Sequence, residues 1–145
     1  MIKHQHTKTP LDYSRSITVA IILPALNESP TIKETIRDFI LHFTTAHIVV
    51  VDNNSSDDTA KIALEELRPT DYLLSQPLRG KARAVRLALE RVVADVYVLC
   101  DADATYSAES ALELMREMLI SRSDMVVGSR MCSGAFSAQN QRAGH

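Results

Sequence analysis

The sequence has little that would suggest a membrane protein, a disulfide scaffold or a secreted chain. It contains only two cysteines, Cys100 in an apolar run and Cys132 in a polar tail, and no tryptophan. Neither cysteine belongs to a Cys-X-X-Cys motif, so we expect two reduced thiols, with a structural role for Cys100. No apolar run approaches the roughly 20 residues that span a bilayer, and the N-terminus lacks the apolar core of a signal peptide. These absences predict a cytoplasmic protein.

An excess of positive charge is also missing. Basic residues number 16 and acidic residues 18, which gives a net charge of -2 with the two signs interspersed. No basic surface therefore predicts nucleic acid as a partner. The chain also lacks a Walker motif and a G-x-G-x-x-G turn, which excludes P-loop and dinucleotide-binding proteins. With 145 residues, 46% of them hydrophobic, it fits one domain.

Short apolar, β-branched runs alternate along the chain with segments of helical periodicity, which predicts an α/β fold with a mostly parallel sheet and helices on both faces. The expected strands are Ile17–Leu23, Ile48–Val51, Tyr72–Ser75, Val96–Cys100 and Met125–Val127. We expect residues 1–16 to form a flexible arm, residues 17–130 the domain, and residues 131–145 an irregular tail.

Two of the intervening helices carry specific expectations. Ser29 is expected to cap the first helix, with Pro30 at its first position. In the helix that begins at Arg79-Gly80-Lys81, the side chains expected to point inward to the core are those of Ala82, Val85, Leu89 and Val92.

Asp101 and Asp103 follow the apolar strand at Val96–Cys100 directly. The carboxyl ends of strands are where open α/β sheets bind their ligands. Two neighbouring carboxylates are costly to keep together unless a cation neutralises them. Magnesium suits a few carboxylates together with substrate phosphates, so the pair predicts a metal site that a diphosphate completes. A lone Asp-X-Asp is also compatible with a solvated loop.

Polar clusters follow other predicted strands as well, and a parallel sheet collects such clusters on a single rim. They are Asn27 with Glu28, Asp52, Arg79 with Lys81, and Arg130. Acids for a metal and cations for phosphate on one rim suit a nucleoside diphosphate.

In this order, the strand-end motifs resemble glycosyltransferase family 2, with its Rossmann-like GT-A fold, and particularly the dolichol- or polyprenyl-phosphate hexose transferases. The motifs that carry the resemblance are Pro24-Ala25-Leu26-Asn27-Glu28, the segment Val51–Thr59, Arg79-Gly80-Lys81-Ala82, Asp101-Ala102-Asp103 and Gly128-Ser129-Arg130. The sequence departs from the family pattern at Asn53 and Asn54, which stand where Asp and Gly are usual, and at Ala82, which replaces Gly. The segment 104–107 lacks the Gly and Pro that the family often has there.

The resemblance implies a role for each matching position. Asp101 and Asp103 would bind Mg²⁺ or Mn²⁺ and, with Arg130, act in catalysis. Glu28 and the backbone of its motif would line the nucleotide pocket, Asp52 would contact the base, and Lys81 would approach the phosphates. The implied donor-binding set is Pro24, Ala25, Leu26, Asn27, Glu28, Asp52, Lys81, Asp101, Ala102 and Asp103.

The function that the resemblance implies is inverting transfer of a sugar from a UDP- or GDP-linked donor to a lipid-phosphate or saccharide acceptor. A lipid acceptor would bring peripheral association with the inner face of the membrane. Such enzymes usually continue beyond the Gly-Ser-Arg segment, so we also expect that the acceptor region is truncated. The base, the sugar, the acceptor and the oligomeric state stay open.

Two alternatives remain at this point. One is a non-catalytic nucleotide-binding domain. The other is a haloacid-dehalogenase-type phosphatase, because Asp101-Ala102-Asp103-Ala104-Thr105 also fits the Asp-X-Asp-X-Thr signature of that class. The phosphatase requires a later acidic pair with a lysine, and only Asp124 follows among the aspartates.

Overall fold

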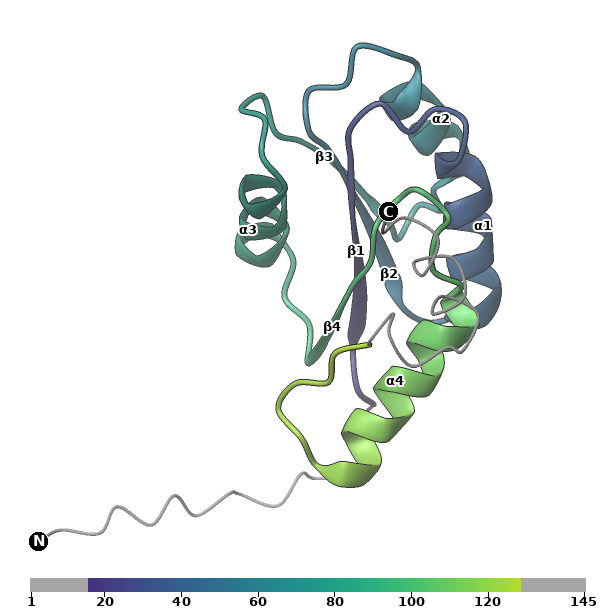
Figure 1. Ribbon diagram of the computed structural model, residues 1–145, viewed down its shortest axis with the longest axis vertical. Helices are drawn as coiled ribbons and strands as arrows, with labels where there is room; N and C mark the ends of the chain where they lie inside the picture. Colours follow the sequence, from purple (N-terminus) through teal and green to yellow (C-terminus); the bar gives the residue numbers. More distant parts are fainter. Residues whose placement is uncertain (1–15, 129–145) are drawn as a thin grey trace, which may run out of the picture.

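The structure is a computed structural model that describes residues 16–128, and these form a sheet covered by helices on both faces (Figure 1). The sheet has four strands in the order β3-β2-β1-β4, all parallel. The strands are β1 Val19–Ala25, β2 His47–Asp52, β3 Tyr72–Ser75 and β4 Val96–Leu99. The helices are α1 Ile32–His42, α2 Thr59–Glu66, α3 Lys81–Arg91 and α4 Ala108–Ser121. The α/β class and the parallel sheet that the sequence predicts are confirmed.

Two apolar layers hold the sheet between its helices. On one face, α1, α2 and α4 pack on the larger cluster, with Ile32, Ile36 and Phe39 of α1 fully buried. On the other face, α3 packs alone through the small side chains of Ala84 and Ala88. The strands between them are apolar on both sides, which is typical of a parallel sheet that is buried on both faces.

The inward face of α3 differs from the prediction. Ala84, Ala88 and Val92 are buried, whereas Leu89 is 46% exposed and Ala82 lies outside. The prediction for Ala82 and Leu89 is wrong because small residues let a helix backbone approach a flat sheet closely. The contact face therefore follows the alanines rather than the largest apolar side chains.

The first helix starts later than predicted. Thr31 is its N-cap residue and makes no side-chain cap, so Ser29 and Pro30 precede the helix. The amide of Ser29 instead donates to Asp57 Oδ2 at 3.1 Å, because this segment is tied to the loop after β2.

β1 extends past Pro24, where the sequence predicts that it ends. Pro24 pairs with Val51 of β2, but β4 pairs with β1 only as far as Ile22. Beyond that point β1 has a strand on one side only, so the missing N–H of proline leaves no partner unsatisfied.

The predicted strand at Met125–Val127 is wrong. These residues are not in a strand, and Met125 and Val127 are 78% and 74% exposed. A strand requires a neighbour for its backbone hydrogen bonds, and this segment pairs with neither β3 nor β4, the edges of the sheet within residues 16–128.

Cys100 lies at the end of β4 and is buried, and this burial raises the pKa of its thiol. A thiol with a raised pKa is a poor nucleophile, which agrees with a structural role. Within residues 16–128, no helix combines the length and the apolar character that crossing a membrane requires.

Candidate functional site

The carboxyl ends of the four strands meet at one edge of the sheet, the upper end in Figure 1, which we call the rim. The strand register aligns the last residues of three strands at this edge: Ala25 of β1 pairs with Asp52 of β2, and Asp52 pairs with Ser75 of β3. The loops that leave the rim lead into α1, α2, α3 and α4. All of the described residues that the sequence predicts for the site lie in these loops or at the ends of the strands and helices that the loops join.

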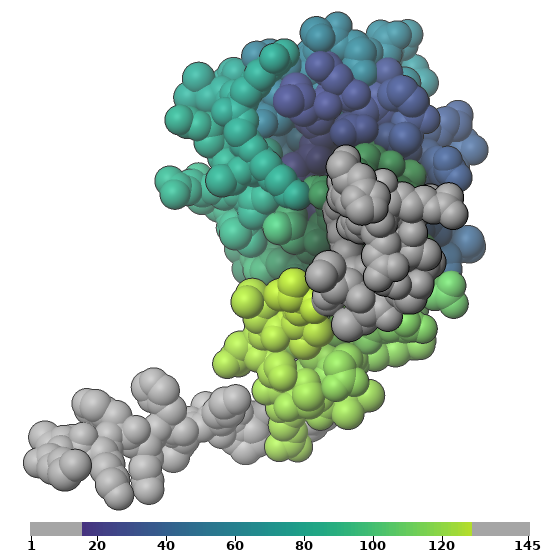
Figure 2. Space-filling model, in the orientation of Figure 1, coloured from purple at the N-terminus to yellow at the C-terminus, as the bar shows by residue number. Residues whose placement is uncertain are grey.

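The loop after β1 is fixed to the loop after β2 by Asn27. Asn27 has a left-handed backbone, with φ of 57°. Its Oδ1 accepts from the backbone N–H of Ser56 at 2.8 Å, and its own N–H donates to Ser55 Oγ at 3.0 Å. The two loops lie against each other at the top of the space-filling view (Figure 2). Of the neighbouring predicted residues, Pro24 and Ala25 lie within β1, and Leu26 is exposed.

Glu28 is held by its backbone and leaves its carboxylate at the rim. Its N–H donates to Thr59 Oγ1 at 2.8 Å, and its Oε2 lies 3.2 Å from the hydroxyl of Thr31, whose single proton is shared with the carbonyl of Ala102. A carboxylate has lone pairs for more than one donor. Glu28 therefore retains capacity to accept from a ligand.

Asp57 adds a further connection between the same two loops. Its carboxylate accepts from the hydroxyl and the N–H of Thr59 and from the N–H of Ser29. The hydrogen bond from the Thr59 hydroxyl is the main reason that the pKa of Asp57 falls to about 2.

Asp52 ends β2 and is only 9% exposed. Its Oδ1 is buried and has no hydrogen-bond partner among residues 16–128. A buried acceptor without a donor costs about 1–3 kcal/mol, so native proteins rarely retain one without a role. A ligand donor at the rim would remove this cost.

Lys81 and Asp101 form an ion pair across the rim. Lys81 is the first residue of α3, Asp101 follows β4, and the ammonium of Lys81 contacts Asp101 Oδ1. The lysine side chain is 57% exposed, so the pair faces solvent. A phosphate at this position would lie within the field of the lysine.

The Asp-X-Asp segment is anchored through its middle residue. The carbonyl of Ala102, which is almost fully buried, accepts from the hydroxyl of Thr31 at 3.0 Å and from that of Thr35 at 3.2 Å. Asp103 is exposed, and its Oδ1 accepts from the N–H of Thr105 at 2.9 Å. The anchor therefore fixes the backbone between the two carboxylates.

Arg130 is the one predicted catalytic residue that lies outside the described residues, together with Ser129 of its motif. Its role therefore stays a prediction, as do the roles of the other predicted site residues, which lie at the rim.

Asn53 is a rim residue whose importance sequence reasoning missed. It is 3% exposed, and its side chain makes three hydrogen bonds to the loop between β3 and α3. The available signal was that Asn53 departs from the family pattern. Thr31, Thr35 and Thr59 were also missed, because a threonine in a loop or at a helix start carries no distinctive spacing.

The donor set of Asp101 and Asp103 fits a divalent cation that is shared with a ligand. Among residues 16–128, no group of three or more His, Cys, Asp or Glu side chains is arranged to hold a metal. Two carboxylates supply hard oxygen ligands, and magnesium commonly completes such a partial set with water and substrate phosphates. The ammonium of Lys81 shows that Asp101 already accepts a cationic partner.

A parallel α/β sheet with acids and a lysine at its carboxyl rim places the chain among the open α/β proteins, a class that binds its ligands at this edge of the sheet. The family is shown by a direct match: the model of glycosyl transferase family 2 covers residues 20–145. The chain belongs to this family and is thereby classified among the glycosyltransferases. The predicted family is confirmed, whereas the likeness to polyprenyl-phosphate transferases stays a prediction.

Two similar proteins are consistent with the assignment to glycosyl transferase family 2. The chain is 41% identical over 130 residues to protein RfbJ of Shigella flexneri, a match that covers 90% of this chain and 97% of RfbJ. It is 31% identical over 117 residues to the low-salt glycan biosynthesis hexosyltransferase Agl6 of Haloferax volcanii, covering 79% of this chain and 28% of Agl6. The chain thus spans nearly all of one relative and a small part of the other.

Solved structures with the same fold carry nucleotide and metal. Glucosyl-3-phosphoglycerate synthase of Mycobacterium tuberculosis, crystallised with Mn²⁺, UDP and glucosyl-3-phosphoglycerate, superposes with a TM-score of 0.61 at 26% identity. The match covers 71% of this chain and 40% of the synthase. A second structure of that enzyme contains Mg²⁺ and UDP. These neighbours confirm the GT-A fold that the sequence predicts.

Proposed function

We propose that this chain binds a nucleoside-diphosphate sugar at its rim and transfers the sugar to an acceptor with inversion at the anomeric carbon. The observation that carries the proposal is the convergence of Glu28, Asp52, Lys81 and Asp101 from four separate strand ends on one edge of the sheet. Acids for a metal, a lysine for phosphate and a buried unpartnered carboxylate oxygen are together what a metal-bridged nucleotide requires.

The roles follow from where each group lies. Asp52, with its unpartnered Oδ1, would accept from the base or ribose, and Glu28 would accept from the nucleoside on the other side of the loop. Lys81 would bind the diphosphate, with Arg130 as its predicted second cation. Asp101 and Asp103 would hold Mg²⁺ or Mn²⁺. When bound, such a cation supplies positive charge that stabilises the departing diphosphate.

The reaction itself exchanges one bond at the anomeric carbon. The bond from this carbon to the diphosphate oxygen breaks, and its electron pair leaves with the nucleoside diphosphate. A new bond forms from the acceptor oxygen on the opposite face, which inverts the configuration. Lys81 stabilises the negative charge that develops on the leaving diphosphate, and the loops that Asn27 and Asp57 connect fix the donor's orientation.

For the acceptor we favour a phosphate group. A phosphate oxygen is already an anion at neutral pH, so its attack needs no general base. One structure of the mycobacterial neighbour contains phosphoglyceric acid together with Mn²⁺ and UDP, so a molecule that carries a phosphate group binds to that enzyme. Polyprenyl phosphate extends the proposal to a lipid, with the chain in the cytoplasm at the inner face of the membrane, and a saccharide is the other acceptor class. UDP is favoured over GDP as the donor's nucleotide, because UDP occupies the neighbour.

The test is a transfer assay on the purified chain with UDP- and GDP-linked sugars and Mn²⁺, against polyprenyl phosphate, 3-phosphoglycerate and a saccharide. We expect acceptor-dependent release of UDP and a product of inverted anomeric configuration by NMR, both lost in Asp103→Asn. Release that needs no acceptor, or a product of retained configuration, would contradict the proposal. Hydrolysis of a generic phosphate ester would instead favour the phosphatase alternative.

A nucleotide-binding domain without catalysis is the second candidate. The observation that favours it is that the unpartnered Oδ1 of Asp52 and the exposed Lys81–Asp101 pair could both be satisfied by a bound nucleotide alone. Binding of UDP with Mn²⁺ but no transfer to any acceptor would support this candidate.

A further inference from the structure

Asn53 connects two strand ends through a buried side chain. Its Nδ2 donates to the carbonyls of Gln76 at 3.1 Å and Leu78 at 2.9 Å. Its Oδ1 accepts from the N–H of Gly80 at 2.7 Å. These three bonds use both donors and one acceptor site of the amide, and all of them go to the loop of residues 76–80 between β3 and α3.

This loop decides where α3 begins. Gly80 is the N-cap residue of α3 and makes no side-chain cap, and its carbonyl accepts from the N–H groups of Arg83 and Ala84. The bond from Asn53 therefore reaches the residue that directly precedes Lys81. The backbone N–H of Asn53 also donates to the carbonyl of Ala25 at 2.8 Å, so its own position is fixed by β1.

Lys81 in turn contacts Asp101 beyond β4. A continuous series of contacts thus runs from Asn53 through Gly80 and Lys81 to the Asp-X-Asp segment. A lysine side chain loses considerable conformational entropy when it is held in one position. A fixed backbone at the start of the helix reduces the entropy that is lost when the ammonium is placed beside Asp101.

We propose that Asn53 is a positioning residue for the donor site, which sets the start of α3 so that the Lys81 ammonium lies beside Asp101. The inference rests on the proposed function, because this placement serves a purpose only if the rim binds a metal-bridged diphosphate. It also gives a physical meaning to a departure from the family pattern. An ionised aspartate at position 53 could accept from Gly80 but could not donate to the two carbonyls.

The first experiment measures the affinity for UDP with Mn²⁺ by isothermal titration calorimetry in a double-mutant cycle. Asn53→Ala and Lys81→Met should each weaken binding about tenfold, the loss typical of one charge-assisted hydrogen bond. Because Asn53 acts through Lys81, the double variant should bind no more weakly than Lys81→Met alone. Independent losses that multiply to about a hundredfold, or Lys81→Met with full affinity, would overturn the inference.

The second experiment needs no nucleotide. Reductive methylation with ¹³C keeps the charge of lysines and gives each an NMR signal, and the Lys81 signal is identified by its loss in Lys81→Arg. In the wild type we expect this signal to be displaced by Asp101 from those of exposed lysines. Asn53→Ala and the near-isosteric Asn53→Asp should move it to the position seen in Asp101→Asn. A displaced signal that persists in both Asn53 variants would contradict the positioning role.

Val49→Ala is the matched control, since Val49 is fully buried in β2, the strand that Asn53 directly follows, but lies away from the rim. It should lower stability while leaving UDP affinity and the Lys81 signal unchanged. Should the wild type fail to bind UDP with Mn²⁺, the donor part of the proposed function is wrong, and the NMR series still decides the role of Asn53.

Discussion

At the scale of single residues, the rim contains carboxylates that differ in how well they are satisfied. Asp57 accepts three hydrogen bonds, whereas Asp52 Oδ1 has no partner among residues 16–128. The first arrangement stabilises the fold, and the second is unfavourable until a donor arrives. Binding sites often show such a trade-off between stability and function.

Asp52→Asn should therefore affect the stability of the fold and the affinity for UDP differently. Removal of the buried charge should leave the free energy of unfolding unchanged or raise it by about 1 kcal/mol. UDP affinity should fall about tenfold, because the neutral amide oxygen accepts a weaker hydrogen bond than a carboxylate oxygen does. Urea unfolding and calorimetry measure both effects. A clear loss of stability with full UDP affinity would show that Asp52 serves the fold alone.

Asp57 predicts a pH dependence of stability. Its pKa is lowered from 3.8 to about 2, chiefly by the hydroxyl of Thr59, so the folded state retains the carboxylate where the unfolded state protonates it. The resulting stabilisation is fully present above about pH 4 and is lost as the pH falls toward 2. In urea unfolding, Asp57→Asn should be less stable than wild type at pH 5, and the difference should shrink at pH 2.5. A difference that is constant over this range would contradict the assignment.

At the scale of elements, the alternation of strands and helices was predictable, because short apolar runs are typical of strands that are buried on both faces of a parallel sheet. Ile48–Val51 and Tyr72–Ser75 are strands as predicted, the first within the longer β2. Met125–Val127 is likewise apolar but has no neighbouring strand within residues 16–128, and local sequence carries no information about whether a partner is present. The prediction of the inward face of α3 was wrong for a related reason, because only the folded structure shows that Ala84 and Ala88 pack against the sheet.

Within the candidate site, the strand ends predicted where the acids and Lys81 lie in the fold, since a parallel sheet must bring them to one rim, whereas their roles stay predictions. The connections between loops were not predictable. Asn53 and Thr35 act through backbone carbonyls more than 20 residues away in sequence, and such partners have no sequence signal of their own.

Gly80, the N-cap residue of α3, is expected to tolerate substitution poorly because of its backbone conformation. Its φ of 140° lies where side chains other than hydrogen are strained, although an added Cβ would meet only the Arg83 side chain at 3.6 Å. Gly80→Ala should lower the free energy of unfolding by about 1–3 kcal/mol through backbone strain. Ala82→Gly, two residues on and exposed, is the control for helix propensity and should cost about 1 kcal/mol. Wild-type stability of Gly80→Ala in urea would contradict the strained geometry.

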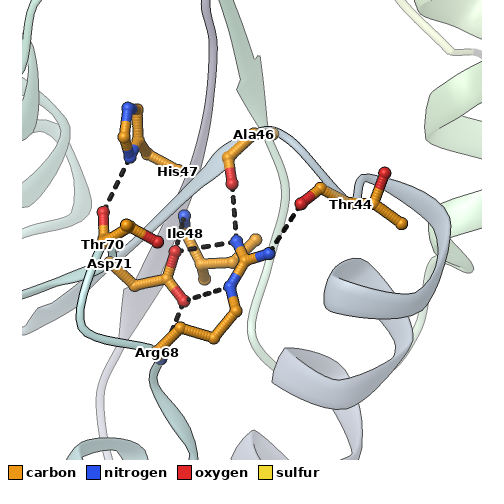
Figure 3. A network of polar contacts seen from close by, with 7 residues as sticks. All are labelled: Thr44, Ala46, His47, Ile48, Arg68, Thr70 and Asp71. Atoms are coloured by element: carbon orange, nitrogen blue, oxygen red, sulfur yellow. Dashed lines mark hydrogen bonds and ion pairs between the residues drawn. The ribbon is translucent and has the colours of Figure 1, made fainter.

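At the scale of the whole molecule, the two ends of the sheet differ: the rim contains the candidate binding site, and the opposite end contains a network that stabilises the fold. The end opposite the rim is held by Arg68, whose guanidinium makes two bonds of 2.9 Å to Asp71 (Figure 3). The same guanidinium donates to the carbonyls of Thr44 and Ala46 at 2.9 and 2.6 Å. Asp71 Oδ1 also accepts from the N–H of Ile48, so loop and strand are joined in one network. All three guanidinium nitrogens of Arg68 and both carboxylate oxygens of Asp71 have partners in this network, which suits a structural role.

Arg68→Met should therefore be strongly destabilising. The side chain of Asp71 is fully shielded from solvent, and loss of the guanidinium leaves a buried charge uncompensated, at a cost of about 3–5 kcal/mol. Arg37→Met is the matched control, because Arg37 pairs with Glu66 but is 62% exposed, and should lose less than about 1 kcal/mol. Equal losses for the two variants in urea unfolding would show that burial does not distinguish these pairs.

The central claim is that groups from separate strands form one site for a cation-bridged nucleoside diphosphate. Its most direct test is calorimetric titration of UDP into the chain with and without Mn²⁺, for the wild type and for Asp103→Asn. We expect Mn²⁺ to strengthen wild-type binding at least about tenfold and to have no effect on the variant. Wild-type affinity that is the same with and without Mn²⁺ would contradict the claim.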